Sequence, residues 1–455
     1  MRADRRLWRS PLAALGAAAI VGVTLLLLAV GLGRHDGSEP HQPTARPPFD
    51  VLYRPPSFVA RGEPTTLRYE IVCPLTGPPK PGFCRPGGIL HLRRTGASEF
   101  DEIPLTTVRH GLAIASVPAS YSLGSGFEYY VELHDERGGS ATVPRGGAAA
   151  PQRSWAIDHW TTVDLGRHRF GSTRRGQALV EAGWGRGARR FGLQRGVGPS
   201  AFGVAPDGAI VVLDQLNRRL AAYPAGTSRP RYAPIPFLGG EGDIAIARDG
   251  TVYVLDAGSP REHLPFVRAY DRELRALAVT PVAETPSNRL AIGPAGAIVH
   301  AVPSEQWLPV GERGRLLAPD EQERRARPAR TFRDGRELVV MASAFEAQLA
   351  LFGRAGVVGS WRIRSVTPLG EVQLAEPYAN GLLVVLRAHT ATRAEWQVLE
   401  LTPHGLGDRF SVHPVEWADA GAGARFRLSG RYLYELRSSR AGVEIARYRL
   451  SARRS

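Results

Sequence analysis

The feature that most constrains the fold is a short unit repeated over the last two thirds of the chain. A glycine that ends a turn and precedes an apolar run recurs at intervals of about 40 to 50 residues. In the clearest copy the turn is followed by one apolar run ending at Asp214 and a second ending at Tyr223. The recurring glycines are Gly208, Gly250, Gly296, Gly335, Gly381 and Gly430.

Each copy predicts a strand, a glycine turn, an apolar strand, a short loop and another strand. Glycine suits the turn because it adopts positive φ without steric cost. One such sheet cannot bury both faces alone, whereas sheets stacked around an axis cover one another. Six copies over 155–455 therefore predict a six-bladed β-propeller. We expect the run 155–165 to pair with the last blade and close the ring.

Two of the copies resemble NHL-type propeller repeats, of the kind found in exported and membrane-anchored actinobacterial proteins. Aspartates that end equivalent strands more often tie down the next loop than form an acid/base pair. We expect the residues that carry the resemblance to form the turns or to hold the following loop in place by hydrogen bonds. They are Asp207, Gly208, Asp214, Asn217, Asp249, Gly250 and Asp256.

The region 49–145 shows strict alternation of apolar and polar residues, which is typical of half-buried antiparallel strands. Leu67, Tyr69 and Ile71 alternate with charged residues, and 127–133 repeats the pattern. Several such strands predict a β-sandwich. The segment 126–144 resembles the last strand pair of bacterial immunoglobulin-like modules, and we expect 146–152 to link it to the propeller. The fold class predicted for the chain outside the membrane is all-β.

The N-terminus predicts a membrane segment at 1–34. Four arginines precede the uncharged run 10–33, which is long enough to cross a bilayer as a helix. The arginines favour a cytoplasmic N-terminus, with the bulk of the chain extracytoplasmic after a linker at 35–48. The alternative is a signal peptide cleaved near 29–31, which would make the protein secreted.

The two cysteines, Cys73 and Cys84, flank a proline-rich loop. On the predicted topology they lie in an oxidising compartment, so we expect a structural disulfide. A metal site there would need further ligands that the neighbouring sequence does not provide.

The formal net charge is +15, and nearly all of the basic residues are arginine. We expect this excess to be scattered, solvated charge; the alternative is an anionic partner such as lipid headgroups or a polyanion. The densest runs lack the interleaved aromatic residues of a base-stacking surface, so no nucleic-acid partner is expected. These runs are Arg186, Arg189, Arg190 and Arg195, and Arg324, Arg325, Arg327 and Arg330.

No catalytic motif is present, so we expect a binding or scaffold protein, without a cofactor, whose propeller engages a protein or cell-envelope ligand. One or two of the tryptophans in the propeller loops would form the partner platform. The alternative is a lactonase-like metal-dependent hydrolase or lyase, with a divalent metal at the central channel. Its candidate ligands are Glu262, His263, His300 and Glu305. A third possibility is a receptor for a small ligand or sugar.

Overall fold

The computed structural model describes residues 49–451 except 73–86, 110, 135–138, 237–241, 258–264, 285, 303, 313–314, 355, 415–416 and 419–423. The predicted membrane segment, its linker and both cysteines, Cys73 and Cys84, lie outside the described residues. Within the part of the chain that is described, no helix is long and apolar enough to cross a membrane.

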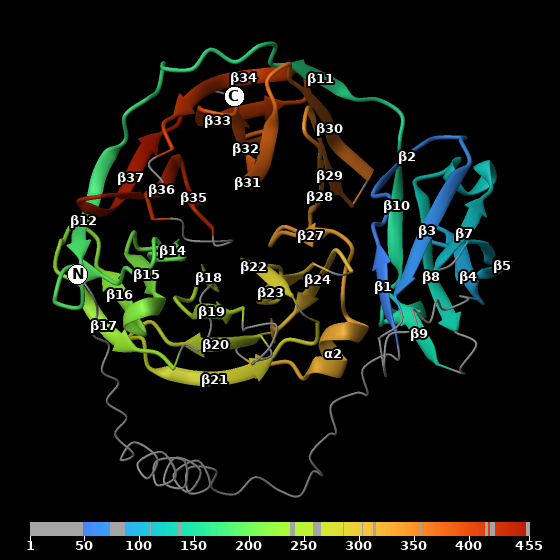
Figure 1. The fold of residues 1–455 in the computed structure, drawn as a ribbon, viewed down its shortest axis with the longest axis horizontal. Coiled ribbons are helices and arrows are strands. Elements are labelled where there is room, and N and C mark those ends of the chain that lie inside the picture. Colours follow the sequence, from blue (N-terminus) through green and yellow to red (C-terminus); the bar gives the residue numbers. More distant parts are fainter. Residues whose placement is uncertain are drawn as a thin grey trace, which may run out of the picture. The chain divides into compact units, whose positions relative to one another are not determined.

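The described residues of 49–157 form two facing sheets (Figure 1). The first sheet has the order β1 (Asp50–Tyr53), β3 (Thr65–Val72), β7 (Leu112–Val117) and β6 (Thr106–Arg109). The second has the order β2 (Phe58–Ala60), β10 (Gln152–Ile157), β8 (Gly126–His134), β4 (Gly87–Arg94) and β5 (Asp101–Pro104), with β9 (Ser140–Val143) also paired to β8.

The alternation in the sequence is the reason these strands pack as they do. Every second residue of β3 is buried, and in β8 the buried positions are Phe127, Tyr129, Val131 and Leu133. Side chains on one face of each strand therefore form the core between the sheets, while the other face is more exposed. Tyr129 also exchanges a hydroxyl hydrogen bond with Tyr53 in this core.

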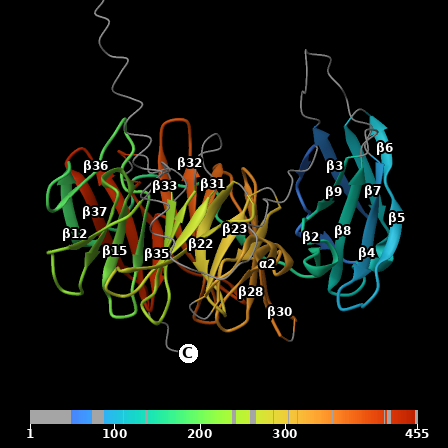
Figure 2. The same ribbon diagram turned by 90° about the horizontal axis from the view of Figure 1, so that it is seen from below.

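From β14 onward the chain forms sheets that follow one another around a central axis, with the first strand of each nearest that axis (Figure 1). This is the architecture of a β-propeller, and Figure 2 shows it edge-on. In chain order, the first three sheets are β14 (Ala201–Val204), β15 (Ile210–Asp214), β16 (Arg219–Tyr223) and β17 (Arg231–Pro234); β18 (Gly242–Ile246), β19 (Val252–Asp256), β20 (Phe266–Tyr270) and β21 (Ala276–Pro281); and β22 (Ser287–Ile292), β23 (Ala297–Ala301) and β24 (Gln306–Pro309). The next two are β27 (Arg330–Thr331), β28 (Glu337–Ala342), β29 (Glu346–Gly353) and β30 (Gly356–Arg364); and β31 (Leu369–Tyr378), β32 (Gly381–His389), β33 (Ala394–Thr402) and β34 (Gly405–Val412). The last is β35 (Phe426–Ser429), β36 (Tyr432–Ser439) and β37 (Gly442–Arg449).

The segment between β24 and β27 interrupts this regular succession. It contains a small hairpin of β25 (Gly311–Glu312) and β26 (Arg315–Leu316), followed by the short helix α2 (Pro319–Arg324). The side chain of Gln322 in α2 is buried and donates to the carbonyl groups of Pro281 and Leu317, at 2.8 and 2.9 Å. These bonds attach the helix to the neighbouring sheet.

Five of the six repeated glycines lie where the sequence predicts, between the first and second strands of the sheets, and the sixth, Gly381, is the first residue of β32. Gly208 has a φ of 83°, in the left-handed region that glycine tolerates. Gly381 serves a different purpose: a Cβ atom there would lie 1.9 Å from the carbonyl oxygen of Leu401 on the adjacent strand. One glycine is required by the turn and the other by close approach of two backbones.

The ring is not closed by the run 155–165, so that prediction was wrong. Residues 152–157 form β10 of the sandwich, and β11 (Thr161–Asp164) pairs in parallel with β30. The outer edge of the β35–β37 sheet is instead covered by β12 (Gln177–Trp184), which pairs with β37 and with the short β13 (Arg190–Phe191). The predicted propeller start at 155 therefore falls inside a strand of the other sheet pair.

Residues 165–176 connect β11 to β12, and we call them the strap. The strap runs beside β34, where Thr173 bridges to Ser411 and the Arg174 N–H donates to the Ser411 carbonyl at 2.8 Å. Its His168 ring lies 2.7 Å from the buried carboxylate of Glu395. One continuous segment thus joins three successive sheets of the ring: β11 pairs with β30, the strap contacts β33 and β34, and β12 pairs with β37.

Candidate functional site

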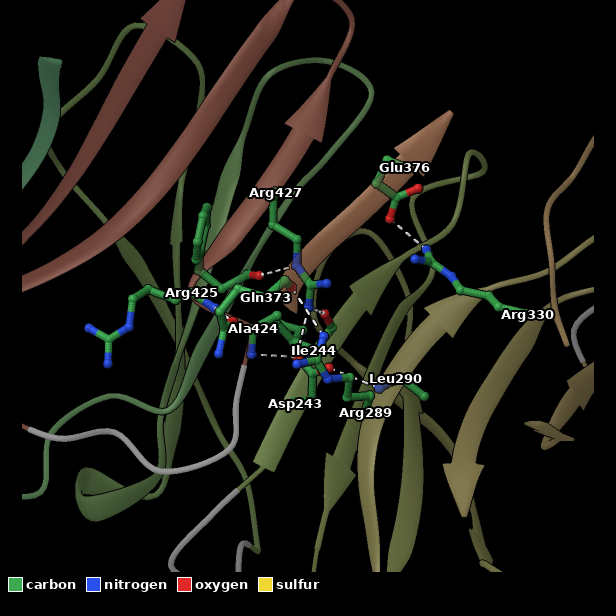
Figure 3. Close-up of polar contacts among 11 residues, drawn as sticks. Asp243, Ile244, Arg289, Leu290, Arg330, Gln373, Glu376, Ala424, Arg425 and Arg427 are labelled. Carbon is green, nitrogen blue, oxygen red and sulfur yellow. Dashed lines mark hydrogen bonds and ion pairs between the residues drawn. The ribbon is translucent and has the colours of Figure 1, made fainter. Parts of the chain in front are cut away.

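Charged side chains on the innermost strands meet at the centre of the propeller (Figure 3). The carboxylate of Asp243, on β18, is fully buried and accepts hydrogen bonds from the Leu290 N–H and from Arg427 Nη2, at 2.8 and 2.7 Å. Leu290 belongs to β22 and Arg427 to β35. Arg427 also donates from Nε to the Phe202 carbonyl on β14, at 2.9 Å. One ion pair therefore joins the inner strands of four sheets.

Two further arginines connect the other inner strands. Arg289 on β22 donates to the Gln373 carbonyl on β31 at 3.1 Å and pairs with Glu371. Arg330 on β27 pairs with Glu376 of β31 at 2.6 Å. The planar guanidinium group has several donors in a rigid arrangement, which suits it to bridging strands in this way.

We call Asp243, Arg289, Arg330, Gln373, Glu376 and Arg427 the central cluster. Asp243 pairs with Arg427 and Glu376 with Arg330, each across a sheet boundary, and Arg289 reaches across to Glu371. These contacts hold different sheets of the ring together. The sequence carries only a partial signal for it: the residue seven positions before the repeated glycine is charged in two of the six copies, as Asp243 and Arg289. The other four copies have an uncharged residue there, so the repeat does not single out these side chains.

Asp214 lies at the end of β15, with its carboxylate buried. It accepts hydrogen bonds from the Gly192 N–H at 2.9 Å, from Asn217 Nδ2 at 2.8 Å and from Arg219 Nε at 2.9 Å. Asn217 also donates to the Gly185 carbonyl at 3.0 Å. These contacts join the end of β15 to the loop 185–192.

The two aspartate–glycine turns have the same local geometry. In each, the aspartate Oδ1 accepts from the N–H two residues ahead, at 3.0 Å for Asp207 and 2.9 Å for Asp249. Gly208 and Gly250 have φ values of 83° and 88°. Asp256 ends β19 and is buried, in the place equivalent to Asp214.

Segment 185–192 directly follows Trp184, which is half-buried and packs against the exposed Trp417. Trp417 is 45% exposed, and its ring lies 5.9 Å from that of Trp184, measured between centroids. The Trp184 indole N–H donates to the Ser439 carbonyl at 2.9 Å, which fixes the orientation of this ring. The exposed residues Arg186, Arg189 and Arg190 follow Trp184 directly. We call these five residues, two tryptophans and three arginines, the tryptophan–arginine surface.

Two arginines at this end of the sheet have left-handed backbone conformations. The φ values are 56° at Arg189 and 52° at Arg218. Such conformations cost a non-glycine residue about 1–2 kcal/mol and tend to gather at functional sites. The Arg189 N–H donates to the Tyr232 hydroxyl at 2.8 Å, which helps to hold the conformation.

Two of the candidate metal ligands meet. His300 on β23 lies 3.3 Å from the Glu305 carboxylate through Nε2 and 3.0 Å from Asn288 Oδ1 through Nδ1. Glu262 and His263 lie outside the described residues. Among the residues that are described, no group of three or more His, Cys, Asp and Glu side chains is placed to hold a metal ion.

No family model and no curated protein matches this chain. Among solved structures it is similar to virginiamycin B lyase from Staphylococcus aureus, at 9% identity and a TM-score of 0.30, over 57% of this chain and 87% of that one. It is also similar to the PQQ-bound aldose sugar dehydrogenase from Streptomyces coelicolor, at 14% identity and a TM-score of 0.33, over 61% and 96%. Overlaps this weak do not bear on function, and the propeller assignment rests on the sheet order itself.

Proposed function

We propose that this chain is a membrane-anchored, extracytoplasmic binding protein. Residues 1–34 anchor it, the sandwich that begins at residue 49 is an immunoglobulin-like spacer, and a six-bladed NHL-like propeller engages a protein or cell-envelope ligand. The observation that carries the proposal is the tryptophan–arginine surface. The central cluster, by contrast, pairs its charges internally.

Exposing a large aromatic side chain to water is unfavourable, so its presence on the surface suggests that a partner covers it. Trp417 offers an extensive apolar face, and tryptophan and arginine are the residues most enriched at interface hot spots. The three exposed arginines that follow Trp184 in the chain favour an anionic partner and speed its encounter. The Trp184 ring packs against the Trp417 ring, so part of the entropy cost of ordering Trp417 is met before binding.

The binding role is tested by co-sedimentation of the purified protein with cell envelopes from a strain that lacks it. We expect Trp417→Ala, and separately Arg186→Gln with Arg190→Gln, to lower the bound fraction at least tenfold. The matched control removes two exposed arginines on the β27–β30 sheet, Arg333→Gln with Arg354→Gln, and is expected to bind normally. Equal losses in both arginine pairs would mean that net charge alone drives association.

The membrane anchor is tested by extracting the protein from membranes with alkaline carbonate. An anchored chain stays in the pellet and its bulk is digested by protease added outside the cell, whereas a cleaved chain appears in the medium.

The alternative is a metal-dependent hydrolase or lyase, favoured by the contact of His300 with Glu305. It predicts turnover of a lactone or ester by the purified protein that is lost with a chelator and restored by a divalent metal. Such turnover, abolished by His300→Ala, would overturn the binding role as the primary function.

A further inference from the structure

An open cleft of about 330 Å³ lies between the β14–β17 sheet and the β18–β21 sheet. Its floor is apolar and comes from both sheets, with Val211 of β15, Val252 of β19 and Leu274 of the β20–β21 turn among its residues. Pockets of this size and lining are typical of sites for small molecules.

The rim of the cleft is charged. Arg272 reaches across the mouth and pairs with Asp207 of the other sheet at 2.7 Å. The N–H of Ala209 and then this guanidinium lower the pKa of the Asp207 carboxyl. Arg231 and Arg248 also line the cleft, and both are exposed.

The guanidinium groups of Arg231 and Arg248 make no hydrogen bond or ion pair with any residue that the structure describes. The carboxylate of Asp207 is already engaged, so Asp249 is the one further acidic residue in the lining. The cleft thus combines an apolar floor with uncompensated positive charge at its edge.

We propose that this cleft binds a small carboxylate that has a compact apolar body. The body would cover the valine and leucine floor, and the carboxylate would pair with Arg231 or Arg248, because guanidinium groups recognise carboxylates with two parallel hydrogen bonds. This site goes beyond the partner-binding role proposed above. It lies at the start of β15, whereas the tryptophan–arginine surface borders the end of that strand.

The test is calorimetric titration of the full-length protein in lipid nanodiscs with 4-phenylbutanoate. The comparison ligands are 4-phenylbutylammonium, which has the same body and the opposite charge, and acetate, which has the charge without the body. Empty nanodiscs give the background. We expect 4-phenylbutanoate to bind at least tenfold more tightly than either comparison ligand.

Variants decide where the ligand binds. Arg231→Gln with Arg248→Gln is expected to weaken binding at least tenfold, and Ala225→Trp, at an exposed residue of the lining, is expected to abolish it by filling the cleft. Arg354→Gln with Arg440→Gln serves as the control and keeps full affinity. Trp417→Ala also keeps full affinity, which separates this proposal from the partner-binding role.

The proposal is overturned if 4-phenylbutanoate does not bind, if the ammonium ligand binds equally well, or if the Arg231 and Arg248 double variant keeps full affinity. Should Ala225→Trp fail to fold, the arginine pair alone decides, since both side chains are exposed and their loss leaves the strands intact.

Discussion

At the scale of single residues, a few buried polar groups hold parts of the chain that are far apart in sequence. Asp243 is fully buried and binds groups from β22 and β35, and Asp214 is buried and binds the loop 185–192. Breaking a buried ion pair by removing one partner leaves the other charge without compensation. Such residues therefore matter more to stability than exposed ion pairs do.

Asp243→Ala is expected to lower the free energy of unfolding by about 3–5 kcal/mol, because it leaves Arg427 unpaired at the centre of the ring. Urea unfolding measures the change. Adding Arg427→Met should restore part of the loss, since the two residues act as a pair. Asp249→Ala, which removes one exposed turn bond, is the control and should cost about 1 kcal/mol. If Asp243→Ala lowered the free energy of unfolding by no more than this, the Asp243–Arg427 pair would not be holding the sheets together.

Glu284 gives a prediction about pH. Burial raises the pKa of its carboxyl, although Ser304 donates a hydrogen bond to it at 2.5 Å. In the unfolded chain the pKa returns to its ordinary value. The folded protein therefore holds this proton more tightly, so the contribution of Glu284 to stability is fully present below the ordinary glutamate pKa and is lost as pH rises through the folded-state pKa.

Glu284→Gln should remove this dependence, because glutamine keeps the shape and carries no charge. We expect the variant to be more stable than the parent above the folded-state pKa, by urea unfolding across a pH series. Glu273→Gln, at an exposed turn position, should leave the profile unchanged. A variant that is less stable than the parent above the folded-state pKa would show that the carboxylate is needed in its charged form.

At the scale of elements, the strap is the connection that local pattern alone does not explain. It has little regular structure, and its position depends on side chains from other sheets. Both carboxylate oxygens of Glu395 on β33 hold it: Oε1 accepts from the Gly171 N–H at 2.7 Å and Oε2 lies 2.7 Å from the His168 ring. The strap therefore depends on one buried residue of the sheet beneath it.

Glu395→Ala is expected to release the strap while the sheet stays folded. Amide hydrogen exchange should speed up at least tenfold over 166–175, with protection in β32 and β33 maintained, because those strands keep their pairing. Unchanged exchange in the strap would show that its backbone bonds to Ser411 suffice to hold it.

At the scale of the whole molecule, the sandwich and the propeller share a core. Trp155 and Ile157 of β10 pack with Ala329, Val339 and Phe352 of the propeller, and the rings of Trp155 and Phe352 stack at 5.4 Å. Trp155 is 1% exposed. The two parts should therefore unfold together.

Trp155→Ala is expected to cost about 3–5 kcal/mol and to split unfolding into two transitions, since it empties the shared core. Calorimetry and intrinsic fluorescence would follow them. Trp417→Ala, at an exposed site, should keep a single transition. A single transition in Trp155→Ala would mean that other contacts couple the two parts.

The sequence by itself determined the repeating strand–glycine–strand unit and the buried face of the sandwich strands. Both depend on residues within a few positions of each other, as the turn at Gly208 and the alternation around Tyr69 show. Only the tertiary structure decided that β12 rather than the run 155–165 covers the last sheet, and that Asp243 faces Arg427. These contacts join residues far apart in the chain, so no local pattern encodes them.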